Sequence, residues 1–484
     1  MFKKFLSLVL FALLFNSNSF SQSGRTESMG GLSFSIIDND HSLTPFNFGS
    51  NPAWLVKDET NTFLKITPFY SNSWGNYRPK YDSEGNSLIG TKVTGVKTLG
   101  ELGTFYGSTS YNYENRRQYF RTLKKDTYAG EAFYFTDSTS GDFSYTGPEV
   151  TLIYSWEALP RFYLGGAVYY EILEGLKQTY SYANTLYRKA GFNIGAAYAV
   201  SENFIVGTSA LYTDIQESVE AADVNLLDVE MFNFRGDNYF FTKRGSSVTQ
   251  KIRKKGFSLG TQLYWSSEKL SIGFQTNFSP ANTRIILPFK TYSEDEEGYA
   301  AFDKYDFQVK TQYQLSDDLI IGAFGSLYNI KSWSKISKKN LMIWEWKFNQ
   351  IAAGIGSTYK ISPDFLAGFE YEFDYSSADS SKYIDGKFIN ISSGNHLIRA
   401  GLEYQVKDNL FLRFGLNYGF NEFDYYTGVK DCNIVRFTFG VGFPLFDEMT
   451  INSFVEYSGL SPKNYSDQSR KFLTIGFSIY LNTF

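Results

Sequence analysis

The sequence predicts an all-β protein: a transmembrane, antiparallel up-and-down β-barrel of the bacterial outer membrane. Three observations predict this fold class. The N-terminal residues have the features of a cleavable export signal. Long segments alternate between apolar and polar residues, and short turns alternate with longer polar loops. We therefore expect a signal peptide at residues 1–21, an N-terminal periplasmic or plug segment at residues 22–58, and the barrel at residues 59–484.

The export signal has the usual three parts. Lys3 and Lys4 precede the apolar run Phe5–Phe15, and Ser19–Ser21 forms a small-x-small cleavage site. The apolar run is too short to span a bilayer, so it matches the core of a secretory signal. The net charge of −4 is too small to indicate a nucleic-acid partner. A single cysteine, Cys432, excludes an intramolecular disulfide and a cysteine-cluster metal site.

The period-2 alternation is clearest in the segments 303–315, 395–406 and 409–420. In the last of these, every even-numbered position from 410 to 420 carries Leu, Phe or Tyr. The alternating segments have about ten to fourteen residues, whereas strands of soluble proteins usually have about five or six. Their apolar faces carry almost no charge, as expected where a Lys or Arg at the bilayer midplane costs roughly 2–4 kcal/mol.

Turns set the predicted number of strands. Short turns recur at residues 201–203, 267–269, 316–318, 362–364, 407–409 and 447–448, and longer polar loops are predicted at 116–145, 215–255 and 280–302. With these turns as anchors, we predict about eighteen strands, and a count of fourteen or sixteen would also fit. The predicted strands begin near residues 62, 86, 102, 148, 161, 190, 203, 256, 268, 303, 318, 347, 363, 395, 409, 434, 449 and 471.

The segment before the first strand carries three short motifs: Met29–Gly31, the Asp-containing turn 38–40, and Asn51-Pro52-Ala53-Trp54-Leu55. In these motifs the chain resembles the family of long-chain fatty-acid transporter barrels and its relatives in Bacteroidetes-type bacteria. The resemblance implies a segment folded back into the lumen as a hatch, with Asn51, Pro52, Ala53 and Trp54 as the plug motif. Some of these relatives serve protein secretion instead. From the residues alone, Asn51-Pro52 is equally typical of a turn leading into a first strand.

Charged residues gather on the predicted lumen face of three sequential strands. One strand carries Glu370, Glu372 and Asp374, the next carries Arg399 and Glu403, and the third carries Arg413. Sequential strands of an up-and-down barrel are neighbours, so acidic and basic groups should lie close together. One interpretation is a ladder of ion pairs within a polar interior. The other is a transverse field that selects solutes.

The predicted outer loops carry charge and aromatic residues. The basic run Lys243–Lys255 and the acidic run Glu294–Glu297 are solvated surface, or pair across the barrel mouth, or bind lipopolysaccharide phosphates on the basic side. The loop aromatics at 133–135 and 239–241 are expected to pack as a lid over the lumen.

No feature of the sequence predicts an enzyme, a cofactor or a metal site. The chain has no phosphate loop or nucleotide fingerprint, and its two histidines, His41 and His396, form no recognisable catalytic arrangement. The leading hypothesis is transport of small solutes, hydrophobic ones among them, by a barrel that contacts outer-membrane lipid and lipopolysaccharide. The alternative is a non-enzymatic adaptor or anchor barrel that binds proteins of a secretion or surface-assembly system.

Overall fold

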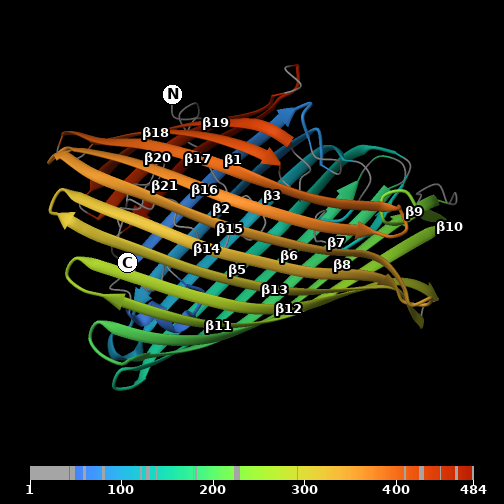
Figure 1. The fold of residues 1–484 in the computed structure, drawn as a ribbon, viewed down its shortest axis with the longest axis horizontal. Coiled ribbons are helices and arrows are strands. Elements are labelled where there is room, and N and C mark those ends of the chain that lie inside the picture. The colour runs from blue at the N-terminus through green and yellow to red at the C-terminus, as the bar shows by residue number, and fades with distance from the viewer. Residues whose placement is uncertain are drawn as a thin grey trace.

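Eighteen antiparallel strands close into one barrel (Figure 1). The computed structural model describes residues 43, 49–57, 62–78, 82–119, 123–126, 131–137, 139–177, 179, 182–222, 229–290, 293–407, 410–423, 430–446, 448–463 and 467–481. The first strand, β1 (Phe63–Gly75), pairs with both β2 and the last strand, β21 (Arg470–Leu481). Closure leaves no unpaired sheet edge, which an open sheet in hydrocarbon would expose. Among the described residues, no helix is long and apolar enough to cross a membrane.

Each barrel strand pairs with the next one along the chain, apart from two places where extra strands leave the wall. There β3 pairs with β5, and β8 pairs with β11. The strands between β1 and β21 are β2 (Gly85–Thr98), β3 (Thr104–Tyr119), β5 (Gly141–Leu159), β6 (Phe162–Lys177), β7 (Tyr182–Ala199), β8 (Phe204–Ala222), β11 (Ser247–Ser266), β12 (Leu270–Lys290), β13 (Ser293–Ser316), β14 (Leu319–Ile336), β15 (Leu341–Ser362), β16 (Phe365–Lys382), β17 (Lys387–Lys407), β18 (Leu410–Phe423), β19 (Lys430–Phe446) and β20 (Met449–Pro462). The described residues also form two short 3₁₀ helices, η1 (Pro52–Lys57) and η2 (Gly100–Leu102). Three further strands in this part of the chain form a second, smaller sheet.

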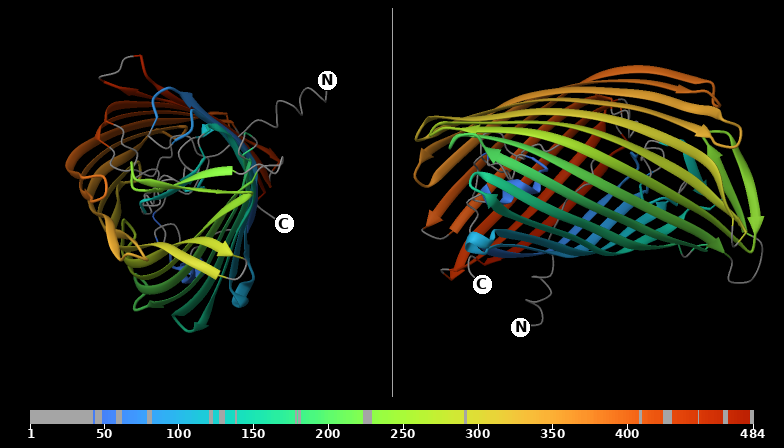
Figure 2. Two further views of the ribbon diagram at one scale, coloured as in Figure 1. Left: turned by 90° about the vertical axis from the view of Figure 1, so that its right-hand side faces the viewer. Right: turned by 90° about the horizontal axis from the view of Figure 1, so that it is seen from below.

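A separate three-stranded sheet lies at the end of the barrel opposite the short turns, which we call the long-loop end. It consists of β4 (Phe133–Thr136), β9 (Val229–Arg235) and β10 (Phe240–Gly245), in the order β10-β9-β4. We call this sheet the lid. Figure 1 labels β9 and β10 at the right-hand end, and Figure 2 shows this end facing the viewer on its left. The strands of the lid lie within the outline of the barrel and reduce its opening.

The predicted strand count of eighteen and the closed antiparallel barrel are confirmed. The predicted long loops at 215–255 and 280–302 are wrong. The first contains the end of β8, both β9 and β10, and the start of β11, and only residues 291–292 separate β12 from β13. The loop predicted at 116–145 likewise contains the end of β3, all of β4 and the start of β5. Beyond the lipid the outward strand face meets water and part of the inward face packs against the lid, so the apolar-outward alternation is lost while backbone pairing continues.

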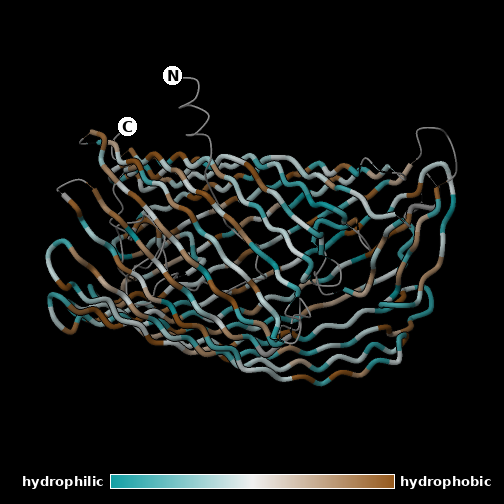
Figure 3. The backbone as a smooth tube through the Cα atoms, turned by 90° about the horizontal axis from the view of Figure 1, so that it is seen from above, coloured by the Kyte–Doolittle hydropathy of each residue, from teal (hydrophilic) through white to brown (hydrophobic). Residues whose placement is uncertain are grey.

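The two faces of the wall differ in chemistry. On β7, Phe192, Ile194 and Tyr198 are about half exposed on the outward face, whereas Asn193 between them is 1% exposed on the inward face. Figure 3 shows the same alternation of hydrophobic and hydrophilic residues along the strands. An apolar outer surface around a closed barrel with a polar interior is what a lipid bilayer requires. The protein is therefore a transmembrane β-barrel of the bacterial outer membrane.

Candidate functional site: the two ends of the lumen

Residues 49–57, which we call the lumenal segment, are fixed to the inner wall of the barrel. The Asn51 side-chain amide donates hydrogen bonds to the carbonyl oxygens of Ala196 on β7 (3.0 Å) and Thr208 on β8 (3.1 Å). Its Oδ1 accepts from the backbone N–H of Ala53 at 3.0 Å. One side chain thus closes the turn that starts η1 and attaches that turn to two barrel strands.

Glycines of the wall lie directly against the backbone of the lumenal segment. Gly165 on β6 and Gly195 on β7 are direct partners across the sheet. A Cβ added to Gly165 would lie 2.4 Å from the Ala53 nitrogen, and one added to Gly195 would lie 1.8 Å from Asn51 Oδ1. Ser155 Oγ, opposite Gly165 on β5, donates to the Ala53 carbonyl at 3.1 Å. These small residues form a row on which the backbone of the lumenal segment rests.

The structure therefore places Asn51, Pro52, Ala53 and Trp54 inside the barrel, near its short-turn end. Trp54 is fully buried and contacts a cluster that includes Ala197, Ile205 and Tyr264 on β7, β8 and β11. The predicted signal peptide lies outside the described residues, and so do residues 22–42, 44–48 and 58 of the predicted plug segment, which include His41.

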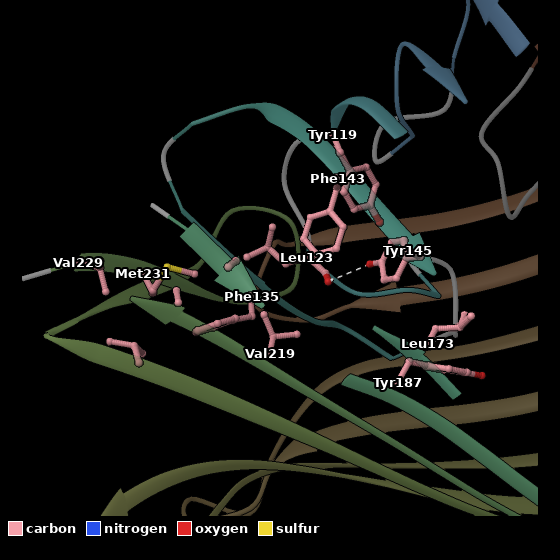
Figure 4. Close-up of a cluster of buried hydrophobic side chains, with 13 residues drawn as sticks. Tyr119, Leu123, Phe135, Phe143, Tyr145, Leu173, Tyr187, Val219, Val229 and Met231 are labelled. Atoms are coloured by element: carbon pink, nitrogen blue, oxygen red, sulfur yellow. Dashed lines mark hydrogen bonds between the residues drawn. The ribbon is translucent and has the colours of Figure 1, made fainter. Parts of the chain in front are cut away.

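At the opposite end, the lid packs into the barrel mouth through an apolar cluster. Phe135 of β4 and Met231 of β9 are fully buried against inward side chains of the wall strands (Figure 4). The Tyr145 hydroxyl donates to the Leu123 carbonyl at 3.3 Å and so also holds the chain that leads to β4. The predicted packing of loop aromatics holds for 133–135, but Tyr239, Phe240 and Phe241 are 38–49% exposed.

Buried ion pairs hold the β4 side of the lid. Lys124 Nζ lies 2.5 Å from Glu131 Oε1, and Lys177 Nζ of β6 lies 2.5 Å from Asp137 Oδ2 just after β4. Burial by itself raises the pKa of the Glu131 carboxyl, but the ammonium groups of Lys124 and Lys254 together with hydrogen bonds outweigh this effect and leave the pKa below its ordinary value. All four side chains are at most 3% exposed, so these pairs work in a low-dielectric environment.

The β9 side of the lid is attached to the opposite part of the wall. Arg235 at the end of β9 forms an ion pair with Glu297 of β13. The backbone N–H groups of Asp237 and Asn238 donate to the Asp385 carboxylate at 2.7 and 2.9 Å, in the turn between β16 and β17. Asp237 in turn pairs with Lys382 at 3.1 Å. The lid therefore bridges the mouth from β6 to the β16–β17 turn.

A cavity of about 220 Å³ lies on the inner wall between these two packed regions. On β6, Tyr169 packs against the cluster that contains Leu55 of the lumenal segment, and Leu173 belongs to the cluster beneath the lid. Between them, Glu171 lines the cavity together with the following residues: Glu149, Val150, Tyr169, Tyr170, Lys189, Gly191, Leu211 and Thr213. The cavity thus combines the apolar and aromatic surface of Val150, Tyr169, Tyr170 and Leu211 with three charged side chains, Glu149, Glu171 and Lys189. Apolar surface with a small number of placed polar groups is common in sites for small organic ligands.

The charged residues predicted to line the lumen are joined along the wall. Arg399 contacts Glu370 at 3.1 Å and Glu372 at 2.9 Å, and Arg413 Nε lies 2.5 Å from Glu403. Asp374 accepts a hydrogen bond from Asn395 at 2.9 Å. Both Glu370 and Glu372 are nearly inaccessible to solvent. Each acidic group thus has a polar partner on the neighbouring strand, as expected for a ladder of ion pairs within a polar interior.

The predicted acidic run of the outer loops pairs with residues outside the basic run. Glu297 pairs with Arg235, Glu296 with Arg284 at 2.5 Å, and Asp295 with Lys338. His396 lies exposed on the outward face of β17, where its Nδ1 is 2.8 Å from the Tyr371 hydroxyl. In the part of the chain that the structure describes, no group of three or more His, Cys, Asp or Glu residues could hold a metal ion.

Sequence reasoning did not identify the glycine row or the cavity. Gly165, Gly195 and Gly207 occupy inward positions on three sequential strands, all against the lumenal segment. Glycines at inward positions of neighbouring strands are the signal that a second backbone lies close to the wall. No comparable signal marks the cavity, because its lining residues come from four strands without a shared motif.

The architecture defines a transmembrane outer-membrane β-barrel whose lumen is occupied near one end and covered at the other. A family model described as "Family of unknown function (DUF6850)" matches residues 52–481, and the chain belongs to this family. None of the curated proteins matches the sequence.

Several solved structures are similar to the chain at low sequence identity. A FadL homologue from Pseudomonas aeruginosa has 11% identity and a TM-score of 0.37, with 98% of this chain and 100% of that chain covered. The toluene transporter TbuX of Ralstonia pickettii has 10% identity and a TM-score of 0.32, with 97% and 100% covered. The copper transporter OprC has 8% identity and a TM-score of 0.51, with 85% and 64% covered. The similarity concerns the fold alone.

Proposed function

We propose that the barrel mediates passage of small, hydrophobic solutes across the outer membrane. The observation that carries the proposal is the cavity on the β5–β8 wall, between the cluster beneath the lid and the cluster around Leu55 of the lumenal segment. A wide aqueous pore has no need of apolar packing at both ends of one wall. A solute that binds apolar and aromatic surface can move from one cluster to the other through this cavity.

Two further observations support a neutral solute. The guanidinium groups of Arg399 and Arg413 are both paired with carboxylates on the wall, so they do not offer the lumen a positive charge for an anionic solute. The lid and the lumenal segment both attach through specific hydrogen bonds and ion pairs. Displacement of one of them is then the step that admits the solute, and the plug role predicted for residues 22–58 belongs to this proposal.

The test compares two transport modes of the same purified protein. In planar bilayers we expect no steady ohmic conductance from the full barrel, while proteoliposomes containing it take up a small uncharged aromatic compound faster than empty liposomes. A variant lacking residues 22–53 should conduct ions. Large ohmic steps from the unaltered protein, or uptake no faster than in empty liposomes, would refute the proposal.

A second candidate function is an adaptor or anchor for surface or secretion proteins. The observation that favours it is the exposure of Tyr239, Phe240 and Phe241 at one edge of the lid, because exposed aromatic clusters are typical of protein-binding surfaces. Replacing all three by serine distinguishes the functions. An adaptor loses its co-purifying partners and leaves solute uptake unchanged, whereas a transporter that uses these residues to capture solute loses uptake.

A further inference from the structure

A row of basic side chains crosses four neighbouring strands on the outward face of the barrel. Arg253 of β11 is the direct partner of Arg284 of β12 on one side and of Gln216 of β8 on the other. Gln216 is in turn the partner of Arg188 on β7, and the two side chains are hydrogen-bonded at 2.5 Å. Partners across a sheet share a face, so these groups lie side by side. The four strands are neighbours in the sheet in the order β7, β8, β11, β12.

The row lies just beyond the aromatic surface of the barrel, towards the long-loop end. Phe192, Tyr212 and Phe257 are partners across β7, β8 and β11 and are 43–52% exposed on the outward face. Each is four residues from Arg188, Gln216 or Arg253 on its strand, which is roughly 13 Å along the strand and again the same face. Aromatic rows mark the membrane interface of such barrels, so the basic row lies at the level of the outer-leaflet head groups.

Basic charge is in excess at this position. Lys251 and Lys255 lie on the outward face of β11, two residues on either side of Arg253. Among the acidic groups, Asp214 lies opposite Lys255 across the sheet, and Glu296 contacts Arg284 at 2.5 Å, so these five basic side chains face two carboxylates. Two arginines placed directly opposite each other repel, and an anion between them removes the repulsion. A guanidinium binds phosphate through two parallel hydrogen bonds.

We propose that this basic row, Arg188, Arg253 and Arg284 with Lys251 and Lys255, binds the phosphate groups of an outer-leaflet glycolipid such as lipopolysaccharide. The row is spread over four strands, about 14 Å of wall, which suits a large phosphorylated head group better than one small ion. The site lies outside the lumen and is independent of what the barrel transports.

The test measures equilibrium binding of fluorescently labelled lipopolysaccharide to the full-length protein in detergent micelles. We expect the R253Q/R284Q variant to bind about tenfold more weakly or worse, because two charge-assisted contacts are lost. The R253K/R284K variant, which keeps the charge, should recover part of the affinity. The matched control K269Q/K360Q removes the same charge at the short-turn end and should bind like the unaltered protein. Equal affinity of all four proteins would overturn the proposal.

Three competitors identify the source of the phosphate. Dephosphorylated lipopolysaccharide should compete poorly, and phosphatidylglycerol and inorganic phosphate should each compete less well than unlabelled lipopolysaccharide. Full competition by the dephosphorylated form would overturn a phosphate site. Equal competition by phosphatidylglycerol or by inorganic phosphate would overturn the assignment to a glycolipid. Retained heat-modifiable migration on gels shows that each variant is folded.

Discussion

Lys124 and Glu131 form an ion pair of 2.5 Å in which the two side chains are only 2% and 1% exposed. Glu131 stands just before β4, and Lys124 lies in the chain that Tyr119 and Tyr145 hold by hydrogen bonds to backbone carbonyls. The pair therefore joins the start of the lid to the segment that precedes it. Removing one partner of such a buried pair leaves an uncompensated charge, which costs about 3–5 kcal/mol.

This pair predicts that the lid loosens in acid. The pKa of Glu131 is below its ordinary value of 4.5 in the folded lid, since Lys124, Lys254 and hydrogen bonds together outweigh the effect of burial. The stabilisation is therefore complete above pH 4.5 and is lost as the pH falls through the lower folded pKa. We expect the protection factors of the amides in residues 131–137, which correct for the slower intrinsic exchange in acid, to fall as the pH drops below 4.5. In E131Q the protection factors should already be low at pH 7 and should depend less on pH. Protection factors that stay constant at every acidic pH at which the barrel remains folded would contradict the prediction.

Gly165 and Gly166 offer a matched pair of substitutions on β6. A Cβ at Gly165 would lie 2.4 Å from the Ala53 nitrogen, whereas a Cβ at Gly166 meets nothing within 4 Å. We expect G165A to displace the lumenal segment, to lower the free energy of unfolding by about 1–3 kcal/mol and to raise ion conductance. G166A should match the unaltered protein in both respects. Conductance and denaturant unfolding measure the two effects, and identical behaviour of the variants would show that the segment does not close the lumen.

Arg399 distinguishes the two interpretations of the charged wall. The R399M variant leaves Glu370 and Glu372 buried without their ion pairs, so we expect it to lower the free energy of unfolding by about 3–5 kcal/mol. Adding E370Q and E372Q should restore much of the loss, because no unpaired charge remains. Urea unfolding in detergent measures both variants. If the residues instead select solutes through a field, R399M changes the reversal potential of an open variant while stability stays the same.

Asp385 tests the attachment of the lid to the β16–β17 turn. Its carboxylate accepts hydrogen bonds from the backbone N–H groups of Asp237 and Asn238, at 2.7 and 2.9 Å. Such bonds to a charged acceptor contribute about 1.5–3 kcal/mol each, so D385A should free this side of the lid and increase hydrogen exchange in β9 and β10. D379A removes an exposed carboxylate of β16 and serves as the control. Equal exchange in the two variants would mean that the lid is held elsewhere.

The part of the fold that lipid contacts could be predicted closely. Predicted strand starts at 203, 409 and 449 lie within one residue of Phe204, Leu410 and Met449, because at the short-turn end each strand passes directly from a polar turn into lipid. At the other end, predicted starts at 256 and 303 fall nine and ten residues after Ser247 and Ser293. There the strands are paired but surrounded by water, and hydrophobic periodicity carries no information about them.

Some contacts of the candidate site could also be predicted from the sequence, and others could not. The contact between Arg399 and Glu370 could be predicted because the residues lie on the same face of sequential strands. The contacts of Lys177 with Asp137 and of Lys382 with Asp237 could not, because they join segments 40 and 145 residues apart that have no periodic pattern. Both depend on where the lid folds, and that is decided by burial of Phe133, Phe135 and their neighbours.

The strands are also far longer than a membrane requires. β13 has 24 residues, whereas crossing a bilayer takes about 9–11 at the usual tilt. A strand of that length, inclined at about 45°, rises roughly 55 Å, so that about 30 Å of it stands above an apolar band of about 25 Å. The lid therefore lies at the top of an extended barrel wall that projects above the membrane, at the height of the surface polysaccharides. If the lid opens as proposed, we expect the thickness and fluidity of the bilayer beneath to have little effect on that step.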